Sequence, residues 1–139
     1  MLINTKFLGT IEIEEKSIIR FDKGLPGFDE LREFAILAVE ENQSLYYLQS
    51  IAEEEICFIV TSPFLIKEDY EIDINEENVA ALEIEKPEHV SLFVILTIPE
   101  DVKNMTANLL APIVVNTANR RAVQEILNND KYHIKHKIF

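Results

Sequence analysis

Cysteine is nearly absent from this chain of 139 residues, and long apolar runs are missing. The single cysteine, Cys57, excludes any disulfide within the chain. We expect it to pack in a strand that faces the core rather than to react, because free cysteine is a small apolar residue that is usually buried. The longest apolar runs, such as residues 92–96, fall far short of the roughly 18 residues of a membrane span, and no basic segment leads into an apolar one at the N-terminus. We therefore expect a cytoplasmic protein without a membrane segment.

Basic residues are also scarce. The chain has 13 Lys and Arg against 25 Asp and Glu, which gives a formal net charge of −12. Direct binding of RNA or DNA is not expected, because phosphate backbones are bound by Lys and Arg. The charge instead suits a basic protein partner, although surplus carboxylates can also serve only to keep a domain in solution.

Glycine is the third scarce residue type. Two of the three glycines, Gly24 and Gly27, flank Leu25 and Pro26 in one short loop. Glycine permits positive φ and proline fixes φ, so the loop is predicted to be a tight turn, with Leu25 and Phe28 closing one end of the core. The glycine spacing fits no nucleotide-binding loop.

Short segments with alternating polar and apolar residues dominate the rest of the chain, and this period of two is typical of β-strands. Residues 1–139 are expected to form one domain that is mainly β, a compact antiparallel β-barrel-like fold with one or two short helices. Strands are predicted at residues 11–13, 17–21, 34–39, 45–51, 56–61, 69–74 and 90–98, and a single helical turn at 29–33.

The stretch 105–127 holds the most continuous β-branched sequence. Residues 109–115 predict a buried strand that bends or breaks at Pro112, because proline has no N–H to donate. Asn116 and Asn119 then supply a turn, since Asn tolerates left-handed dihedrals. Residues 120–127 fit the spacing of a helix as well as that of a strand. The best helix candidate is 75–82, with Asn75 as its N-cap.

Signals for catalysis are weak. His133 and His136 stand three residues apart, but a metal pair would need a helical tail, and no cysteine or converging aspartate accompanies them. A tail that is merely rich in Lys and His is the better interpretation. The acidic stretches 53–55 and 83–88 are expected to be solvated. We expect no catalytic residue, no metal ligand and no cofactor.

Five motifs stand in register along the chain. They are Gly-Leu-Pro-Gly-Phe at 24–28, Leu-Gln-Ser at 48–50, Val-Thr-Ser-Pro-Phe at 60–64, Tyr-Glu-Ile at 70–72 and Thr-Ala-Asn-Leu-Leu-Ala-Pro-Ile-Val-Val-Asn at 106–116. Together they resemble the bacterial flagellar assembly factor FliW family over almost the whole chain. Two features depart from the family, because Ser62 stands where Asn is expected and no proline follows Tyr132 and His136. In that family the segment after the Asn116 turn is a strand, which favours a strand at 120–127 here.

The resemblance implies a non-enzymatic regulator with two protein partners. Members of this family bind flagellin near its C-terminal end and bind CsrA, an RNA-binding translational repressor. Free flagellin would thereby release the factor to antagonise CsrA on flagellin mRNA. An acidic protein docked on a basic RNA-binding protein would lower RNA affinity by adding negative potential. The alternative is a small metal-dependent hydrolase that uses surface carboxylates and His133.

The resemblance and the charge pattern together suggest where the partners bind. In the predicted edge strand 69–74, alternate acidic residues would project outward to meet CsrA, and the apolar residues between them would anchor the strand. Exposed parts of the stretch 108–112 would add to this surface and line an apolar groove for an amphipathic flagellin segment. The candidate binding residues are Tyr70, Glu71, Ile72, Asp73, Asn108, Leu109, Leu110 and Pro112.

Overall fold

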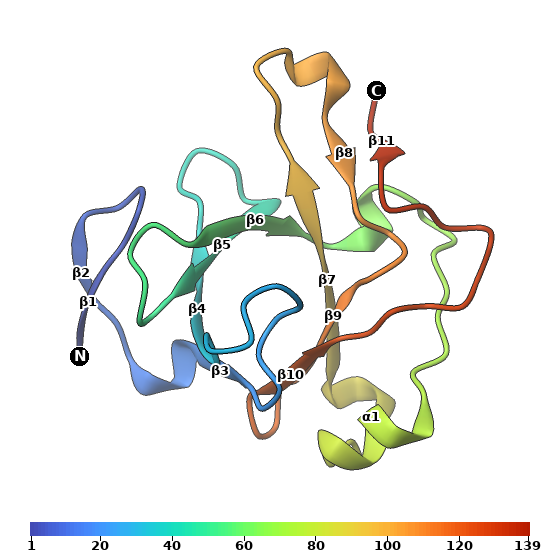
Figure 1. Ribbon diagram of the computed structural model, residues 1–139, viewed down its shortest axis with the longest axis horizontal. Helices are drawn as coiled ribbons and strands as arrows, with labels where there is room; N and C mark the ends of the chain where they lie inside the picture. The colour runs from blue at the N-terminus through green and yellow to red at the C-terminus, as the bar shows by residue number, and fades with distance from the viewer.

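A closed barrel of seven β-strands forms the centre of the computed structural model, which describes residues 1–139 (Figure 1). Six neighbouring pairs are antiparallel, and β3 and β10 close the barrel as a parallel pair. In order around the barrel the strands are β3 (Ile18–Phe21), β4 (Glu33–Ala38), β5 (Leu45–Ser50), β6 (Cys57–Thr61), β7 (Val90–Thr97), β9 (Ile113–Asn116) and β10 (Arg121–Gln124). The predicted fold class is confirmed. Within the ambiguous stretch 120–127, residues 121–124 form the strand β10, whereas residues 125–127 are irregular.

The remaining elements lie outside the barrel. β1 (Leu2–Asn4) and β2 (Thr10–Glu12) form a separate two-stranded sheet, while β8 (Thr106–Ala107) extends from β7 and pairs with β11 (His136–Lys137). The helices are α1 (Glu76–Ala81) and the short 3-10 helices η1 (Glu15–Ser17), η2 (Pro63–Leu65), η3 (Pro87–His89) and η4 (Val102–Asn104). None of them has the length and apolar content with which a helix could cross a membrane.

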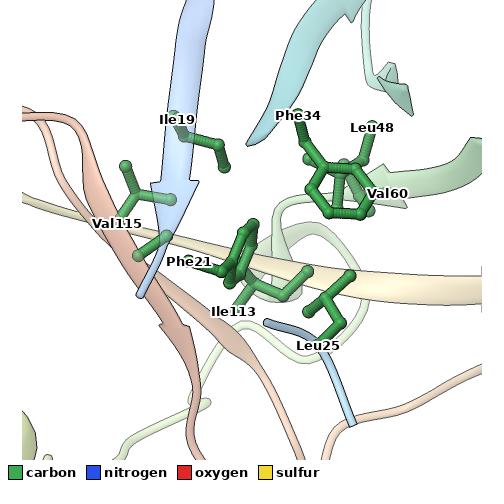
Figure 2. Packing of buried hydrophobic residues seen from close by; sticks show 9 residues of the cluster. Ile19, Phe21, Leu25, Phe34, Leu48, Val60, Ile113 and Val115 are labelled. Atoms are coloured by element: carbon green, nitrogen blue, oxygen red, sulfur yellow. The ribbon is translucent and has the colours of Figure 1, made fainter. Parts of the chain in front are cut away.

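The interior of the barrel is filled by alternate residues of its strands. Phe21 and Phe34 meet edge to face, with ring centres 5.5 Å apart (Figure 2). The buried residues of this cluster are all apolar: Ile19, Phe21, Leu25, Phe34, Leu48, Val60, Ile113, Val115 and Ala122. We call this cluster the inner core. Around it, the strands of the barrel wall are joined by backbone pairing.

Cys57 does not face the inner core, and the prediction that it does is wrong. Phe58, the next residue of β6, packs against the inner core, so the alternation of the strand turns Cys57 to the outer face of the barrel. Cys57 is half-buried there. Burial raises the pKa of its thiol to about 11, which keeps the thiolate scarce at neutral pH.

The loop between β3 and β4 closes one end of the barrel, as predicted. Leu25 is buried in the inner core, and Phe28 packs its ring edge against Phe58. Gly24 and Gly27 have φ of +69° and +86°, values that residues with a side chain rarely adopt. The helical turn predicted at 29–33 is absent, because the chain turns there and β4 already begins at residue 33.

A second core lies outside the barrel, on the outer face of β7. Val94 and Leu96 point outward because Phe93 and Ile95 point inward. Three irregular segments cover them, namely residues 62–75, 105–112 and 125–139, and we call these segments the outer layer. The buried residues of this outer core are Tyr70, Val94, Leu96, Ala107, Leu109 and Tyr132. Figure 1 shows the outer layer beside the barrel, with the C-terminal tail and the chain before α1 running along the same side.

Gln49 joins the N-terminal hairpin to the barrel and explains one of the sequence motifs. Its side chain is fully buried on the outer side of β5. The side-chain oxygen accepts from the N–H of Lys6 (3.0 Å), and the amide nitrogen donates to the carbonyls of Ser50 (3.1 Å) and Glu54 (3.0 Å). One side chain thus links the backbone of the N-terminal hairpin to that of the turn between β5 and β6.

Residues 69–74 do not form the predicted edge strand. Their side chains alternate as expected, with Tyr70 buried, Ile72 half-buried and Glu71 exposed. No strand pairs with them, however, and the N–H of Glu71 donates to the Tyr132 hydroxyl instead (2.8 Å). Alternation decides which side chains face the core, but a strand also needs a partner backbone.

The Asn-rich turn after β9 is present, but its chemistry differs from the prediction. Neither Asn116 nor Asn119 has positive φ; Arg120, with φ of 62°, takes the left-handed position. The asparagine side chains act through hydrogen bonds. The amide groups of Asn116 and Asn119 donate to the carbonyl of Leu82 at 2.8 and 2.9 Å. They thereby satisfy the C-terminal end of α1, whose N-cap is Asn75, as predicted.

Candidate partner-binding surface

An open hollow of about 980 Å³ lies between two parts of the outer layer, residues 67–75 and 125–132. Most of its lining is polar. The lining residues are Lys67, Asp69, Glu71, Ile72, Asp73, Asn75, Glu125, Ile126, Leu127, Asn128, Asn129, Lys131 and Tyr132. We call it the acidic hollow, because four carboxylates and two lysines line it.

Tyr132 lines the acidic hollow, and Tyr70 packs against it from the outer core. Tyr70 is buried, and its hydroxyl donates to the carbonyl of Leu109 at 2.7 Å. Its ring lies 4.6 Å from that of Tyr132, whose hydroxyl accepts from the N–H of Glu71. Burial, assisted by the neighbouring Tyr132, raises the pKa of Tyr70, so the hydroxyl stays protonated and available as a donor.

Glu125 fixes the other wall, and no local signal in the sequence points to it. It is only 3% exposed, and its carboxylate accepts from the backbone N–H of Asn75 (2.9 Å) and from the side-chain amide of Asn75 (2.8 Å). Asn75 is also the N-cap of α1, since its side-chain oxygen accepts from the N–H of Asn78. Glu125 therefore positions the start of the helix from a point far along the chain.

The other three carboxylates of the hollow lie at the surface. Glu71, Asp73 and Asp69 are exposed, and Asp69 pairs with Lys67 at 3.3 Å. An exposed ion pair of this kind contributes little to stability. The predicted projection of Glu71 and Asp73 into solvent is present, although the segment that carries them is irregular rather than a strand.

The other half of the predicted surface is mostly hidden, and this corrects the sequence-based prediction. Leu109 is fully buried, Pro112 is buried, and Leu110 is half-buried in the outer core. The half-buried Asn108 has its side-chain oxygen engaged by the N–H of Ala111 (3.0 Å). The apolar residues at 109–112 therefore pack inward, and none of them lines the acidic hollow.

The apolar groove lies elsewhere, over the first half of β7. It has a volume of about 490 Å³ and borders the acidic hollow, with Ile72 and Asp73 belonging to both. Its residues come from η2, the 72–74 segment, α1, the loop from α1 into η3, and β7: Phe64, Ile72, Asp73, Ile74, Val79, Ile84, Glu85, Lys86, Pro87, Val90 and Leu92. We call it the β7 groove. Phe64, which lines it, is 48% exposed.

The hydrolase alternative gains no support from this arrangement. Carboxylates do converge on the acidic hollow, but Glu125 is committed to Asn75, and no three His, Cys, Asp or Glu side chains are placed to share a metal ion. His133 is exposed. Charged groups line the acidic hollow, and an apolar groove lies beside it.

Comparisons with known proteins agree on one family. The model of the FliW protein family matches residues 2–138. The flagellar assembly factor FliW of Caldanaerobacter subterraneus subsp. tengcongensis is 47% identical over 139 residues, with 99% of this chain and 93% of the relative covered. That of Clostridium tetani is 46% identical, with 100% and 96% covered. A crystal structure of the flagellar assembly factor FliW superposes with a TM-score of 0.94 at 40% identity, and the match covers 100% of this chain and 97% of that one.

Proposed function

The chain belongs to the FliW family of flagellar assembly factors, and from that premise we propose that it is a cytoplasmic, non-enzymatic regulator with two protein partners. One partner is flagellin, bound through its C-terminal region. The other is CsrA, which it antagonises so that flagellin mRNA is translated. The observation that carries the proposal is the family match over the whole chain, at an identity that preserves the fold.

The acidic hollow supports CsrA as one partner. Glu71 and Asp73 are exposed on a segment that Tyr70 fixes from beneath. A basic protein can therefore bind them with little loss of conformational entropy. Negative potential beside an RNA site lowers its affinity for phosphates even where the site is not covered. The chain itself is not expected to bind nucleic acid, since its net charge is −12.

The β7 groove supports flagellin as the other. An amphipathic segment that is unfolded before assembly needs an apolar groove in which to bury its anchors. The β7 groove offers Phe64, Val79 and Leu92 for this purpose. Because it shares Ile72 and Asp73 with the acidic hollow, occupation of one site would influence the other.

The test for CsrA is a titration of the double variant Glu71→Lys, Asp73→Lys. We expect its affinity for CsrA to fall and the salt dependence of association to weaken, since rim charges act within a Debye length of about 10 Å at 0.1 M salt. The matched control is Glu54→Lys, Glu55→Lys, which makes the same charge change at exposed positions between β5 and β6. Equal losses of CsrA affinity in both variants would mean that the net charge, and not the acidic hollow, determines binding. A wild-type protein that captures neither CsrA nor flagellin would refute the function itself.

The test for flagellin is Phe64→Ala, measured against a peptide of the flagellin C-terminal region. Removing an aromatic anchor from a groove is expected to weaken binding at least tenfold. Phe7→Ala is the control, because Phe7 is similarly exposed, at 50%, on the distant N-terminal hairpin. Unchanged binding by Phe64→Ala would exclude the β7 groove as the flagellin site.

A further inference from the structure

The two ends of the barrel differ. The loop that carries Leu25 fills the end at which β3 finishes, whereas the end at which β3 begins holds a cavity of about 250 Å³. Figure 2 shows Ile19 and Val115 together on the side of the inner core away from Leu25. We call this cavity the barrel mouth. It shares no residue with the acidic hollow or the β7 groove.

The floor of the barrel mouth is apolar. Ile19 and Val115 are buried, at 4% exposure each, while Ile36 and Phe93 pack against the inner core and stay partly exposed. At this point apolar side chains of the barrel interior line a cavity that opens to solvent. An apolar group that entered here would gain the burial that the inner core already provides.

The rim of the barrel mouth is cationic, although the chain as a whole is acidic. Lys16 and Arg120 stand on it together with the hydroxyl residues Ser17, Ser91 and Thr117. None of the residues that line the mouth is acidic, although the chain has 25 Asp and Glu. The lining thus combines apolar walls with positive charge and hydrogen-bonding groups, as small-ligand sites commonly do.

Arg120 is the rim cation without a carboxylate at ion-pair distance. Lys16 is paired with Glu14 at 3.0 Å, and the neighbouring Arg121 lies 3.5 Å from Glu83. No acidic side chain of this very acidic chain takes the corresponding place beside Arg120. A guanidinium on the edge of an apolar cavity is suited to a planar carboxylate, which it can bind through two parallel hydrogen bonds.

The backbone of Arg120 is fixed at some cost. Its φ is 62°, its N–H donates to the carbonyl of Asn116 (2.7 Å), and its carbonyl accepts from the N–H of Arg20 (2.9 Å). The left-handed conformation costs roughly 1–2 kcal/mol for a residue with a side chain, whereas glycine adopts it freely. A residue with a side chain thus takes this left-handed position at the rim of the mouth, where glycine would cost less.

We propose that the barrel mouth binds a small carboxylate that carries one apolar group. The apolar group enters between Ile36 and Phe93, the carboxylate pairs with Arg120, and the hydroxyls of Ser17 and Ser91 lie on the same rim to donate hydrogen bonds. The cavity is smaller than the roughly 300–1,000 Å³ of sites for drug-sized ligands, so the ligand is about the size of one large side chain. Two sources offer this chemistry: a free short-chain acid, and the C-terminal residue of a peptide.

The test uses the full chain, labelled at the methyl groups of Ile, Leu and Val, and three probes. The probes are 4-methylpentanoate for a free acid, N-acetyl-leucine for a peptide end, and 4-methylpentanamide, which lacks the charge. We expect at least one carboxylate to shift the methyl signals of Ile19, Ile36 and Val115, and the amide to bind at least tenfold more weakly. Selective binding of one carboxylate identifies whether the ligand is a free acid or a peptide end. Equal binding of both shows that the site recognises only the carboxylate and the apolar group that they share. No shift with either carboxylate, or equal binding of the amide, overturns the proposal.

The matched variants are Arg120→Gly and Arg121→Gln. Glycine accepts the left-handed backbone, so Arg120→Gly should fold at least as stably as the wild type while binding weakens at least tenfold. Arg121→Gln removes a neighbouring guanidinium outside the mouth and should leave the affinity unchanged. Arg120→Asn, which also tolerates positive φ, gives a second variant if the glycine chain folds poorly. Full affinity in a folded Arg120 variant would also overturn the proposal.

Discussion

The inner core and the outer layer are built by opposite means. The inner core is wholly apolar, and a closed ladder of backbone hydrogen bonds surrounds it. The outer layer has only the two-residue strands β8 and β11, and side chains such as Tyr70, Tyr132 and Glu125 satisfy its backbone. Both the acidic hollow and the β7 groove lie in or beside the outer layer. A regular wall makes a rigid scaffold, whereas an irregular layer can present charged and apolar groups in positions that a strand ladder would not allow.

The comparison predicts that the same substitution has unequal effects in the two regions. Phe34→Ala should lower the free energy of unfolding by about 3–5 kcal/mol, because Phe34 is fully buried between Phe21 and Phe58. Phe64→Ala in the outer layer should cost about 1 kcal/mol or less, since nearly half of that side chain is exposed. Urea unfolding followed by circular dichroism measures both values. Similar losses would mean that the outer layer is as integral to the fold as the barrel.

The loop between β3 and β4, which closes one end of the barrel, offers a second pair of substitutions to compare. A Cβ on Gly24 would lie 2.5 Å from the carbonyl oxygen of Asp29, whereas a Cβ on Gly27 would meet nothing within 4 Å. Gly27→Ala should cost roughly 1–2 kcal/mol for its positive φ alone. Gly24→Ala should cost about 2–5 kcal/mol, because the clash is with backbone that cannot move aside. Melting temperatures of the two variants test the order, and a more stable Gly24→Ala would show that the loop does not seal the barrel.

In the outer layer, Tyr70→Phe isolates one hydrogen bond. The variant keeps the ring against Tyr132 but leaves the buried carbonyl of Leu109 without its donor, at a cost of about 1–3 kcal/mol. We expect this loss in urea unfolding at pH 8. A loss near zero would mean that ring packing alone holds the segment, and that the hydroxyl has no structural role.

The same variant predicts a dependence on alkaline pH. The pKa of Tyr70 is raised in the folded state, so the neutral hydroxyl stabilises the fold fully below the unfolded pKa of about 10, and this stabilisation is lost as the pH rises further. The difference in stability between wild type and Tyr70→Phe should therefore shrink as the pH rises above about 10. Groups common to both proteins cancel in this difference. A gap that stays constant would indicate that Tyr70 ionises equally in both states.

The sequence predicted the barrel better than the outer layer, because the two regions depend on different kinds of contact. Alternation identified most of the barrel strands, and Asn75 and the Gly24 loop were predicted from local chemistry, because each depends on neighbours in the sequence. The segment 69–74 has the period of a strand but lacks a partner, which periodicity does not report. The Glu125 side chain bonds Asn75 from 50 positions away, so no local pattern could reveal it. Burial of Leu109 was predicted, but the expectation that part of it stays exposed was wrong, since the sequence did not show that the tail covers it.

The smallest expected effect on stability belongs to the double variant Glu71→Lys, Asp73→Lys. Both carboxylates are exposed and neither takes part in an ion pair of the fold. The change should therefore move the free energy of unfolding by no more than about 0.5 kcal/mol, since substitutions at such positions are usually near neutral. Urea unfolding beside the CsrA titration measures this directly. If Tyr70, Tyr132 and Glu125 fix the outer layer, its surface charges can change without destabilising it. A loss of CsrA binding would then reflect lost contacts rather than partial unfolding. A destabilisation as large as that of Tyr70→Phe would instead mean that these carboxylates help to hold the outer layer, and the separation between scaffold and binding surface would fail at this point.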